Sequence, residues 1–361
     1  MRKSRLVLGL LAAGGLAAAV ACSSGFDAQS QVDSVRMFAV RADKPYVKAG
    51  ESVTLEALYT DARKLKQPRE AKNYWVPLVC LNPVQDAYYA CFVPGLGGAD
   101  GGASGGGTRF IPTGPLADAG AAAAGGDGGA FTGLSSIPTD VDLGPFLPQG
   151  TSFSFTMPAD AITPRKGSAP YGLAVVFNIL CAGKVTFASR DPNGGPQQVP
   201  LRCTDDNGVQ LSPKDYVIGI SRVYTFADRT NTNPVIEKVT LEGADVDLKA
   251  GITLEPCRAA KRDDCKDNKI DVRVSDASWE LNPDENGNDQ GLREQIWVDY
   301  YSDIGKFDND ARLLFDTKKG RVSESENKYK APNDPAEGTI WAVVHDNRGG
   351  VAWVVIPLHV K

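Results

Sequence analysis

The chain has 361 residues, 42% hydrophobic and 23% charged, the balance of a globular protein long enough for two domains. Its formal net charge is −5, and loss of the basic residues Arg2, Lys3 and Arg5 would bring it to about −8. An acidic chain without clustered Lys and Arg excludes nucleic acid as a partner. It also disfavours an anionic lipid surface as a partner beyond any N-terminal anchor.

Residues 1–21 have the layout of a secretory signal peptide. A basic start precedes an apolar run at residues 6–11, and small residues fill positions 12–21. The run is too short and too rich in Gly and Ala for a permanent spanning helix, which needs about 20 apolar residues.

The segment ends at Cys22, one of seven cysteines. Ala19-Val20-Ala21 satisfies the rule for ordinary cleavage, which would leave a secreted protein with a spare thiol. The stretch also resembles the bacterial lipobox, in which the Cys carries acyl chains and becomes the new N-terminus. Lipid on Cys22 would leave six cysteines, all able to pair, so we expect the protein to be held to a membrane there. Ser23 and Ser24 follow Cys22, and Asp does not. This resembles the sequence of bacterial lipoproteins that are sorted to the outer membrane. Residues 22–32 would be a polar tether.

The six remaining cysteines predict an oxidising compartment and three disulfides. Fifteen pairings are possible. Spacing favours the local one, in which each bridge closes a short loop of turn residues. The predicted pairs are Cys80–Cys91, Cys181–Cys203 and Cys257–Cys265. Structural zinc is disfavoured because no C-x₂-C pair occurs and His345 and His359 are the only histidines. No cofactor is expected.

Residues 33–230 predict a first β-sandwich. Apolar and polar residues alternate over 34–61 with a turn at 48–51, and strands are expected at 73–81, 151–162, 171–183 and 215–226. The run at 171–183 is continuously apolar, as in a strand covered on both faces. Residues 94–130 are a Gly/Ala-rich insertion that we expect to be disordered, and they contain no phosphate-loop motif. Residues 231–234 suggest a linker.

Residues 233–361 predict a second sandwich. Strand-like runs recur every 10 to 15 residues with Gly, Asn and Asp between them, and neither unit contains a convincing amphipathic helix. The last two runs flank a turn at 346–350, rich in residues that tolerate turn conformations. Trp341, Val343, Val351 and Trp353 would pack on the sandwich core. The expected fold is all-β, with two tandem immunoglobulin-like β-sandwich domains.

The closing hairpin, "GTIWAVVHDNRGGVAWVV", resembles the last hairpin of bacterial immunoglobulin-like domains of the PKD and cadherin-like kind. The likeness covers roughly 25 residues, and the acidic Trp-Asp-Phe-Gly-Asp signature of that family is absent. Tyr171 has a similar place in the first unit and could form a tyrosine corner. The whole layout resembles exported bacterial lipoproteins with tandem sandwiches and no assigned chemistry.

Candidate catalytic and metal-binding groups are sparse. The two histidines lie in no nucleophile motif. Asp284, Asn286 and Asn288 have the spacing of the first EF-hand ligands, but Asp289 and Gln295 replace the Gly and Glu of that loop. A polar hairpin loop and a weak calcium site therefore remain alternatives. Tyr74, Trp75, Tyr88 and Tyr89 could form a sugar-stacking platform or be core residues.

The sequence therefore predicts a lipid-anchored, non-enzymatic protein of the outer membrane and cell envelope that acts as a structural or binding module. Its partner would be another envelope protein or a glycan. A carbohydrate-binding module, with or without calcium, is the alternative. A glycoside hydrolase with paired carboxylates ranks third.

Overall fold

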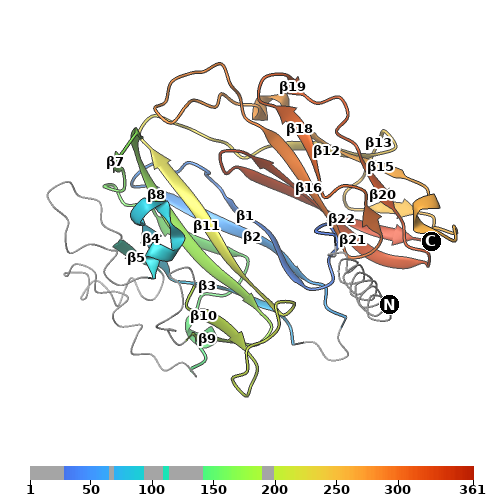
Figure 1. The fold of residues 1–361 in the computed structure, drawn as a ribbon, viewed down its shortest axis with the longest axis horizontal. Helices are drawn as coiled ribbons and strands as arrows, with labels where there is room; N and C mark the ends of the chain where they lie inside the picture. The colour runs from blue at the N-terminus through green and yellow to red at the C-terminus, as the bar shows by residue number, and fades with distance from the viewer. Residues whose placement is uncertain (1–27, 65–68, 93–108, 114–140, 189–198) are drawn as a thin grey trace, which may run out of the picture.

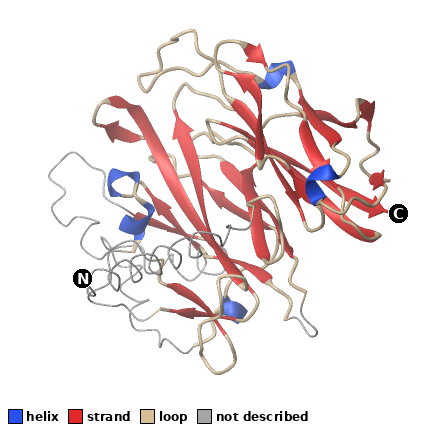
Figure 2. Cartoon of the chain, turned by 45° about the vertical axis from the view of Figure 1, so that its right-hand side comes forward, coloured by secondary structure: helices blue, strands red, loops and turns tan. Residues whose placement is uncertain are grey.

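The computed structural model describes residues 28–64, 69–92, 109–113, 141–188 and 199–361. Cys22 and most of the 94–130 insertion lie outside these ranges. The described chain is built of strands, and its helical elements are 3₁₀ turns of three or four residues. Figure 2 shows strands across the whole molecule. None of the helices in the described ranges has the length and apolarity to cross a bilayer. The predicted all-β class is confirmed.

The described part of the first unit contains eleven strands. Three form one sheet in the order β1-β2-β6, and another sheet runs β11-β8-β4-β5, with β3 and β7 also paired to β8. β9 and β10 make a separate hairpin. Their bounds are β1 Val35–Ala42, β2 Ser52–Asp61, β3 Lys72–Trp75, β4 Leu78–Leu81, β5 Arg109–Pro112, β6 Ser152–Thr156, β7 Thr163–Arg165, β8 Ser168–Cys181, β9 Lys184–Phe187, β10 Leu201–Thr204 and β11 Tyr216–Phe226. The 3₁₀ turns are η1 Val84–Asp86, η2 Tyr88–Cys91 and η4 Gly144–Phe146.

The second unit also has two large sheets. Their orders are β13-β12-β15-β20-β17 and β14-β22-β21-β16-β18-β19. The strands are β12 Ile236–Leu241, β13 Ala244–Asp245, β14 Ile252–Leu254, β15 Asn268–Val274, β16 Ile296–Ser302, β17 Lys306–Phe307, β18 Ala311–Asp316, β19 Gly320–Arg321, β20 Asn327–Lys330, β21 Ala336–Asp346 and β22 Val351–Val360. The 3₁₀ turns are η5 Arg262–Asp264 and η6 Asp276–Ser278. No sheet of the described chain contains strands from both units.

Each unit buries its own apolar core between its two large sheets. In the first, Leu55 of β2 and Phe155 of β6 pack with Trp75 and Val176 from the facing sheet. In the second, Val272 of β15 and Tyr329 of β20 pack with Val298 of β16 and Val344 of β21. Such face-to-face packing makes each unit a β-sandwich. As expected, β8 is buried continuously over its second half.

Two parts of the first unit differ from the sequence-based expectation. The strand expected over 73–81 is divided into β3 and β4, because Pro77 has no backbone N–H to donate to a sheet. Within the insertion, which we expected to be disordered throughout, Arg109–Pro112 form β5 and pair with β4. Two apolar residues, Phe110 and Ile111, allow this short run to join the sheet edge.

A third apolar cluster lies between the units and joins them. Phe38 of β1 stacks on Trp341 of β21 and lies against Tyr301 of β16, with 4.8 Å between ring centroids in each pair. Val343 and Val351 belong to the same cluster. We define the junction cluster as these five residues with Val32, Ala39, Leu58, Ala62 and Trp353. Figure 1 shows β1 and β2 beside β21, β22 and β16.

The closing hairpin was expected to pack on the core of its own sandwich, and the junction cluster shows that this expectation is wrong for four of its residues. The hairpin forms as predicted, with a turn between β21 and β22. However, Trp341, Val343, Val351 and Trp353 face the first unit, not the core of their own sandwich. The core-facing positions of β21 are Ile340, Ala342 and Val344. Since alternate residues of a strand face opposite sides, both faces of this hairpin are apolar and both are covered.

Candidate functional site at the junction of the two units

A polar network beside the junction cluster is centred on Arg348, in the turn between β21 and β22. The side chain of Asp346 shapes this turn by accepting hydrogen bonds from the backbone N–H of Arg348 at 2.7 Å and of Gly350 at 2.8 Å. An aspartate that bonds to backbone N–H groups two and four residues later stabilises a tight turn. The turn therefore holds the Arg348 side chain toward the segment that connects the units.

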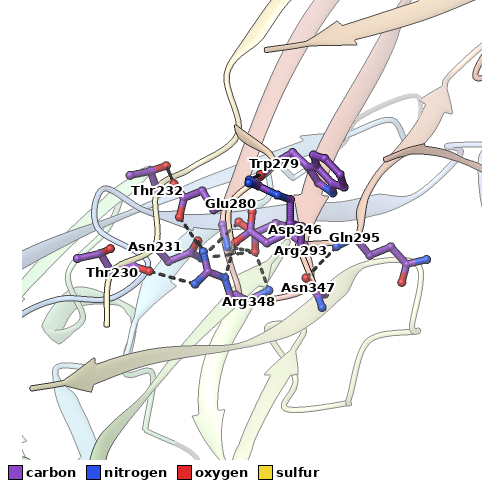
Figure 3. A network of polar contacts seen from close by, with 12 residues as sticks. Thr230, Asn231, Thr232, Trp279, Glu280, Arg293, Gln295, Asp346, Asn347 and Arg348 are labelled. Atoms are coloured by element: carbon purple, nitrogen blue, oxygen red, sulfur yellow. Dashed lines mark hydrogen bonds and ion pairs between the residues drawn. The ribbon is translucent and has the colours of Figure 1, made fainter. Parts of the chain in front are cut away.

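The guanidinium of Arg348 binds groups from three segments that are distant in sequence (Figure 3). It donates to the carboxylate of Glu280 at 2.7 Å and to the side-chain oxygen of Asn231 at 2.9 Å, and its Nε donates to Glu294. A further bond of 3.1 Å reaches the carbonyl of Thr230. The Arg348 side chain is only 7% exposed. A planar fork of donors suits such convergence of several acceptors.

The network contains more negative than positive groups. Glu280, Glu294 and Asp346 surround the single guanidinium, and the Glu294 side chain is fully buried. Its Oε2 atom has no hydrogen-bond partner among the described residues. All three acids therefore lie around Arg348.

The environment shifts the ionisation of two of these acids. Burial, and then the charge of Asp346, raises the pKa of Glu294 to about 7, although Arg348 opposes the shift. Burial also raises the pKa of Asp346, against the lowering effect of the backbone N–H groups of Gly350 and Arg348. Removal from water disfavours the charged form of a carboxyl group. Glu294 therefore changes charge near neutral pH.

This shift predicts a pH-dependent stability. Because the folded-state pKa of Glu294 lies above its ordinary value, its contribution is present below about pH 4.5 and is lost as pH rises through about 7. Glu294→Gln should therefore remove much of the decline in the free energy of unfolding across that range, as measured by urea denaturation at several pH values. The exposed Glu237, changed to Gln, is the matched control and should leave the decline intact. If the decline in Glu294→Gln equals that of the unchanged protein, Glu294 is not its cause.

The segment at 231–234, expected to be a linker, is fixed in place at the junction. Asn231 is 6% exposed and its amide donates to Asp346 at 3.3 Å. Asn233 accepts from the backbone N–H of Val351 at 2.8 Å and donates to the carbonyl of Ala42 at 2.7 Å. The segment therefore bonds to both units, which restricts their relative movement.

The structure pairs the six cysteines in the local arrangement that the spacing favours: Cys80–Cys91, Cys181–Cys203 and Cys257–Cys265. The first bridge closes a loop in which Asn82, Gln85 and Asp86 adopt positive φ angles. Such angles are costly for residues other than glycine and persist where surrounding contacts fix them.

The two histidines and the four aromatic residues that the sequence singled out contact other side chains of the protein. His345 lies 3.2 Å from Asp299 and stacks on Trp297, and His359 contacts Glu337. Trp75 is fully buried and Tyr74 is 7% exposed, so neither can stack on a sugar. Tyr88 and Tyr89 are partly exposed and contact each other edge to face.

The 284–289 loop is closed by its own hydrogen bonds. One carboxylate oxygen of Asp284 accepts from the backbone N–H of Asn286 at 2.9 Å and of Asn288 at 2.8 Å, and the other accepts from Gln290 at 3.1 Å. The bonds from Asn288 are the main cause that lowers the pKa of Asp284. No set of three or more His, Cys, Asp or Glu side chains in the described ranges is placed to hold a metal ion. The loop has the geometry of a polar turn.

The proposed tyrosine corner at Tyr171 is not formed. Its hydroxyl donates to the side chain of Asp86, from the loop closed by the first disulfide, whereas a tyrosine corner bonds to nearby backbone. Arg165 stacks over the Tyr171 ring at 4.3 Å and pairs with Asp86 at 3.0 Å. The ring is part of an aromatic group that also contains Tyr46, Tyr224 and Phe226.

A cavity of about 340 Å³ lies in the second unit, beside the Cys257–Cys265 disulfide. Leu254 at the end of β14 and Leu241 at the end of β12 contribute apolar surface. The lining carries charges of both signs, from Arg258, Lys266, Glu242, Glu255 and Asp264. Its volume is in the range of small-molecule sites. Nothing in the sequence pattern indicated it, because its walls come from four separate segments.

No family model matches the chain, and no curated protein matches it. Among solved structures, it is similar to the fibronectin(III)-like modules of Clostridium thermocellum CbhA, with 11% identity over 90% of this chain and 94% of that chain, and a TM-score of 0.21. Escherichia coli alpha-2-macroglobulin matches at 11% identity over 91% of this chain, which spans 17% of that protein, with a TM-score of 0.22. The chicken CNTN1 FN1–FN3 domains match at 8% identity over 92% and 66% of the two chains, with a TM-score of 0.18. Because all three TM-scores are low, the all-β assignment rests on the chain's own sheets: two β-sandwiches joined by a buried junction.

Proposed function

We propose that the protein is a non-enzymatic, rigid two-part module of the cell envelope, held to the outer membrane by lipid on Cys22 and serving a structural or binding role. The observation that carries this proposal is the junction, where apolar side chains of both units are buried together. Beside them, Arg348 of the second unit bonds to Thr230 and Asn231 of the segment that connects the units. A fixed junction presents surfaces of both units in one constant arrangement, which suits a scaffold or a binding protein. The signal-peptide pattern and the disulfides support an exported location.

The lipid anchor predicts a change in fractionation. Cys22→Ala should move the protein from the membrane fraction to the soluble fraction, because the acyl chains supply the attachment. Fractionation of the native host followed by immunoblotting measures this. Ser23→Ala is the neighbouring control and should stay with the membrane. Equal membrane association of the unchanged protein, Cys22→Ala and Ser23→Ala would contradict the lipid anchor.

The non-enzymatic role has a separate test. The purified protein should leave a panel of glycosides, esters and peptides intact under the conditions in which it is folded. Hydrolysis that survives repurification and disappears on substitution of Glu280 or Glu294 would overturn this part of the proposal.

One observation favours carbohydrate binding as a second candidate function. Tyr46, Tyr171, Tyr224 and Phe226 are partly exposed and contact one another, with centroid distances of 4.7 to 6.3 Å. Arg229 lies 4.8 Å from the centre of the Phe226 ring. Aromatic faces flanked by polar groups can stack on sugars. A glycan array without signal, in calcium and in chelator, would remove this candidate.

A further inference from the structure

The last five residues of the expected tether, 28–32, bind the second unit, although they lead into β1 of the first. The backbone N–H of Val32 donates to the carbonyl of Ser302 at 2.9 Å, and the N–H of Ser302 donates to the carbonyl of Ser30 at 2.8 Å. These two bonds form a parallel bridge between Gln31 and the end of β16. We call residues 28–32 the strap.

Further contacts hold the strap in place. The backbone N–H of Ser30 donates to the Asp310 carboxylate at 3.0 Å, and Arg36 donates to the carbonyl of Gln29 at 2.8 Å. Ser30 and Val32 are each 2% exposed, and Val32 belongs to the junction cluster. The strap is therefore part of the folded body.

This placement limits the distance between the folded body and the lipid. From Cys22 to Ala28 the chain advances six residues. Even fully extended, six residues span at most roughly 22 Å. This limit is independent of the conformation of those residues.

We infer that the strap holds the Ser302–Asp310 side of the second unit against the membrane, so that this side faces the lipid surface and the β7–β8 end of the first unit points away from it. The inference rests on the proposed lipid anchor at Cys22. In Figure 1 the blue start of the described chain lies beside β21, whereas β7 lies at the opposite end of the long axis.

The charge of the lipid-facing side does not favour binding to anionic lipid. Asp310 is exposed and accepts a hydrogen bond from the strap. Asp308 is also exposed and pairs with Lys330, and Lys306 is the basic residue between Ser302 and Asp310. A surface that binds anionic lipid by charge needs clustered Lys or Arg. The short tether therefore sets the orientation, and neutral vesicles are the appropriate membrane for a test.

Energy transfer to the membrane can measure this orientation. The lipidated protein carries a donor dye on Asn309→Cys, beside the strap, or on Lys166→Cys, in the exposed β7–β8 turn, and is reconstituted into phosphatidylcholine vesicles that contain an acceptor-labelled lipid. Transfer from position 309 should be clearly greater than from position 166. The excess should shrink when about 20 Gly and Ser residues are inserted after Ser24, because they add roughly 25 Å of root-mean-square reach.

The outcomes separate this inference from the proposed anchor. Equal transfer from both positions in vesicle-bound protein, or greater transfer from position 166, would overturn the orientation while leaving the anchor intact. An excess at position 309 that persists after the insertion would show that the tether does not set it, and would also overturn the inference. Protein that does not bind vesicles and has an unmodified Cys22 by mass spectrometry would overturn both proposals.

Discussion

Arg348→Ala should lower the free energy of unfolding by about 3–5 kcal/mol, the cost of removing one partner from a buried ion pair. The substitution leaves Glu280, Glu294 and Asp346 close together without their cation. Since Glu294 is fully buried, water cannot replace the lost partner without opening the junction. Urea denaturation of the Cys22→Ala form at pH 8, above the Glu294 pKa of about 7, measures the loss.

Two further variants separate the causes of that loss. Arg348→Lys keeps the charge but cannot donate in a fork to Glu280, Glu294 and Asn231 together, so it should recover only part of the stability. Arg109→Ala is the matched control, because Arg109 pairs with Asp160 while 44% exposed, and such pairs are worth about 0–1 kcal/mol. Equal losses in Arg348→Ala and Arg109→Ala would show that the junction network does not stabilise the protein.

Phe38→Ala should have an effect of similar size, about 3–5 kcal/mol, as is typical for truncating a buried aromatic residue. Phe38 stacks between Trp341 and Tyr301, and its ring lies outside the core of its own sandwich. The variant should therefore leave each sandwich intact but weaken their association. Urea denaturation followed by tryptophan fluorescence gives the loss.

The control for Phe38 is a largely exposed phenylalanine. Phe146 is 76% exposed, and Phe146→Ala should change stability by no more than about 0.5 kcal/mol. A loss in Phe38→Ala no larger than in Phe146→Ala would mean that the junction cluster contributes little.

The strand pattern was predictable from sequence because period-two alternation and turn residues are local signals. The runs at 35–61 and 338–355 became β1, β2 and the β21–β22 hairpin as expected. β5 was missed because Phe110 and Ile111 are surrounded by Gly-rich sequence that has no strand signal of its own. Whether so short a run joins a sheet depends on the neighbouring β4 edge.

The junction could not be predicted in the same way. Apolar residues occupy both faces of β21 and β22, and alternation alone does not tell which face meets another unit. Arg348 and Glu280 are 68 residues apart in sequence, and Arg348 and Glu294 are 54 apart, so no local spacing connects them. One signal was available: Asn and Pro at 231–234 are compatible with a fixed turn as well as with a flexible linker.

Differential scanning calorimetry of the Cys22→Ala form tests most directly whether the two sandwiches behave as one body. The buried junction predicts a single transition in which the calorimetric and van't Hoff enthalpies agree. Phe38→Ala should divide or broaden that transition. Two well-separated transitions in protein with an intact junction would contradict the account, because each sandwich would then unfold without disturbing the other.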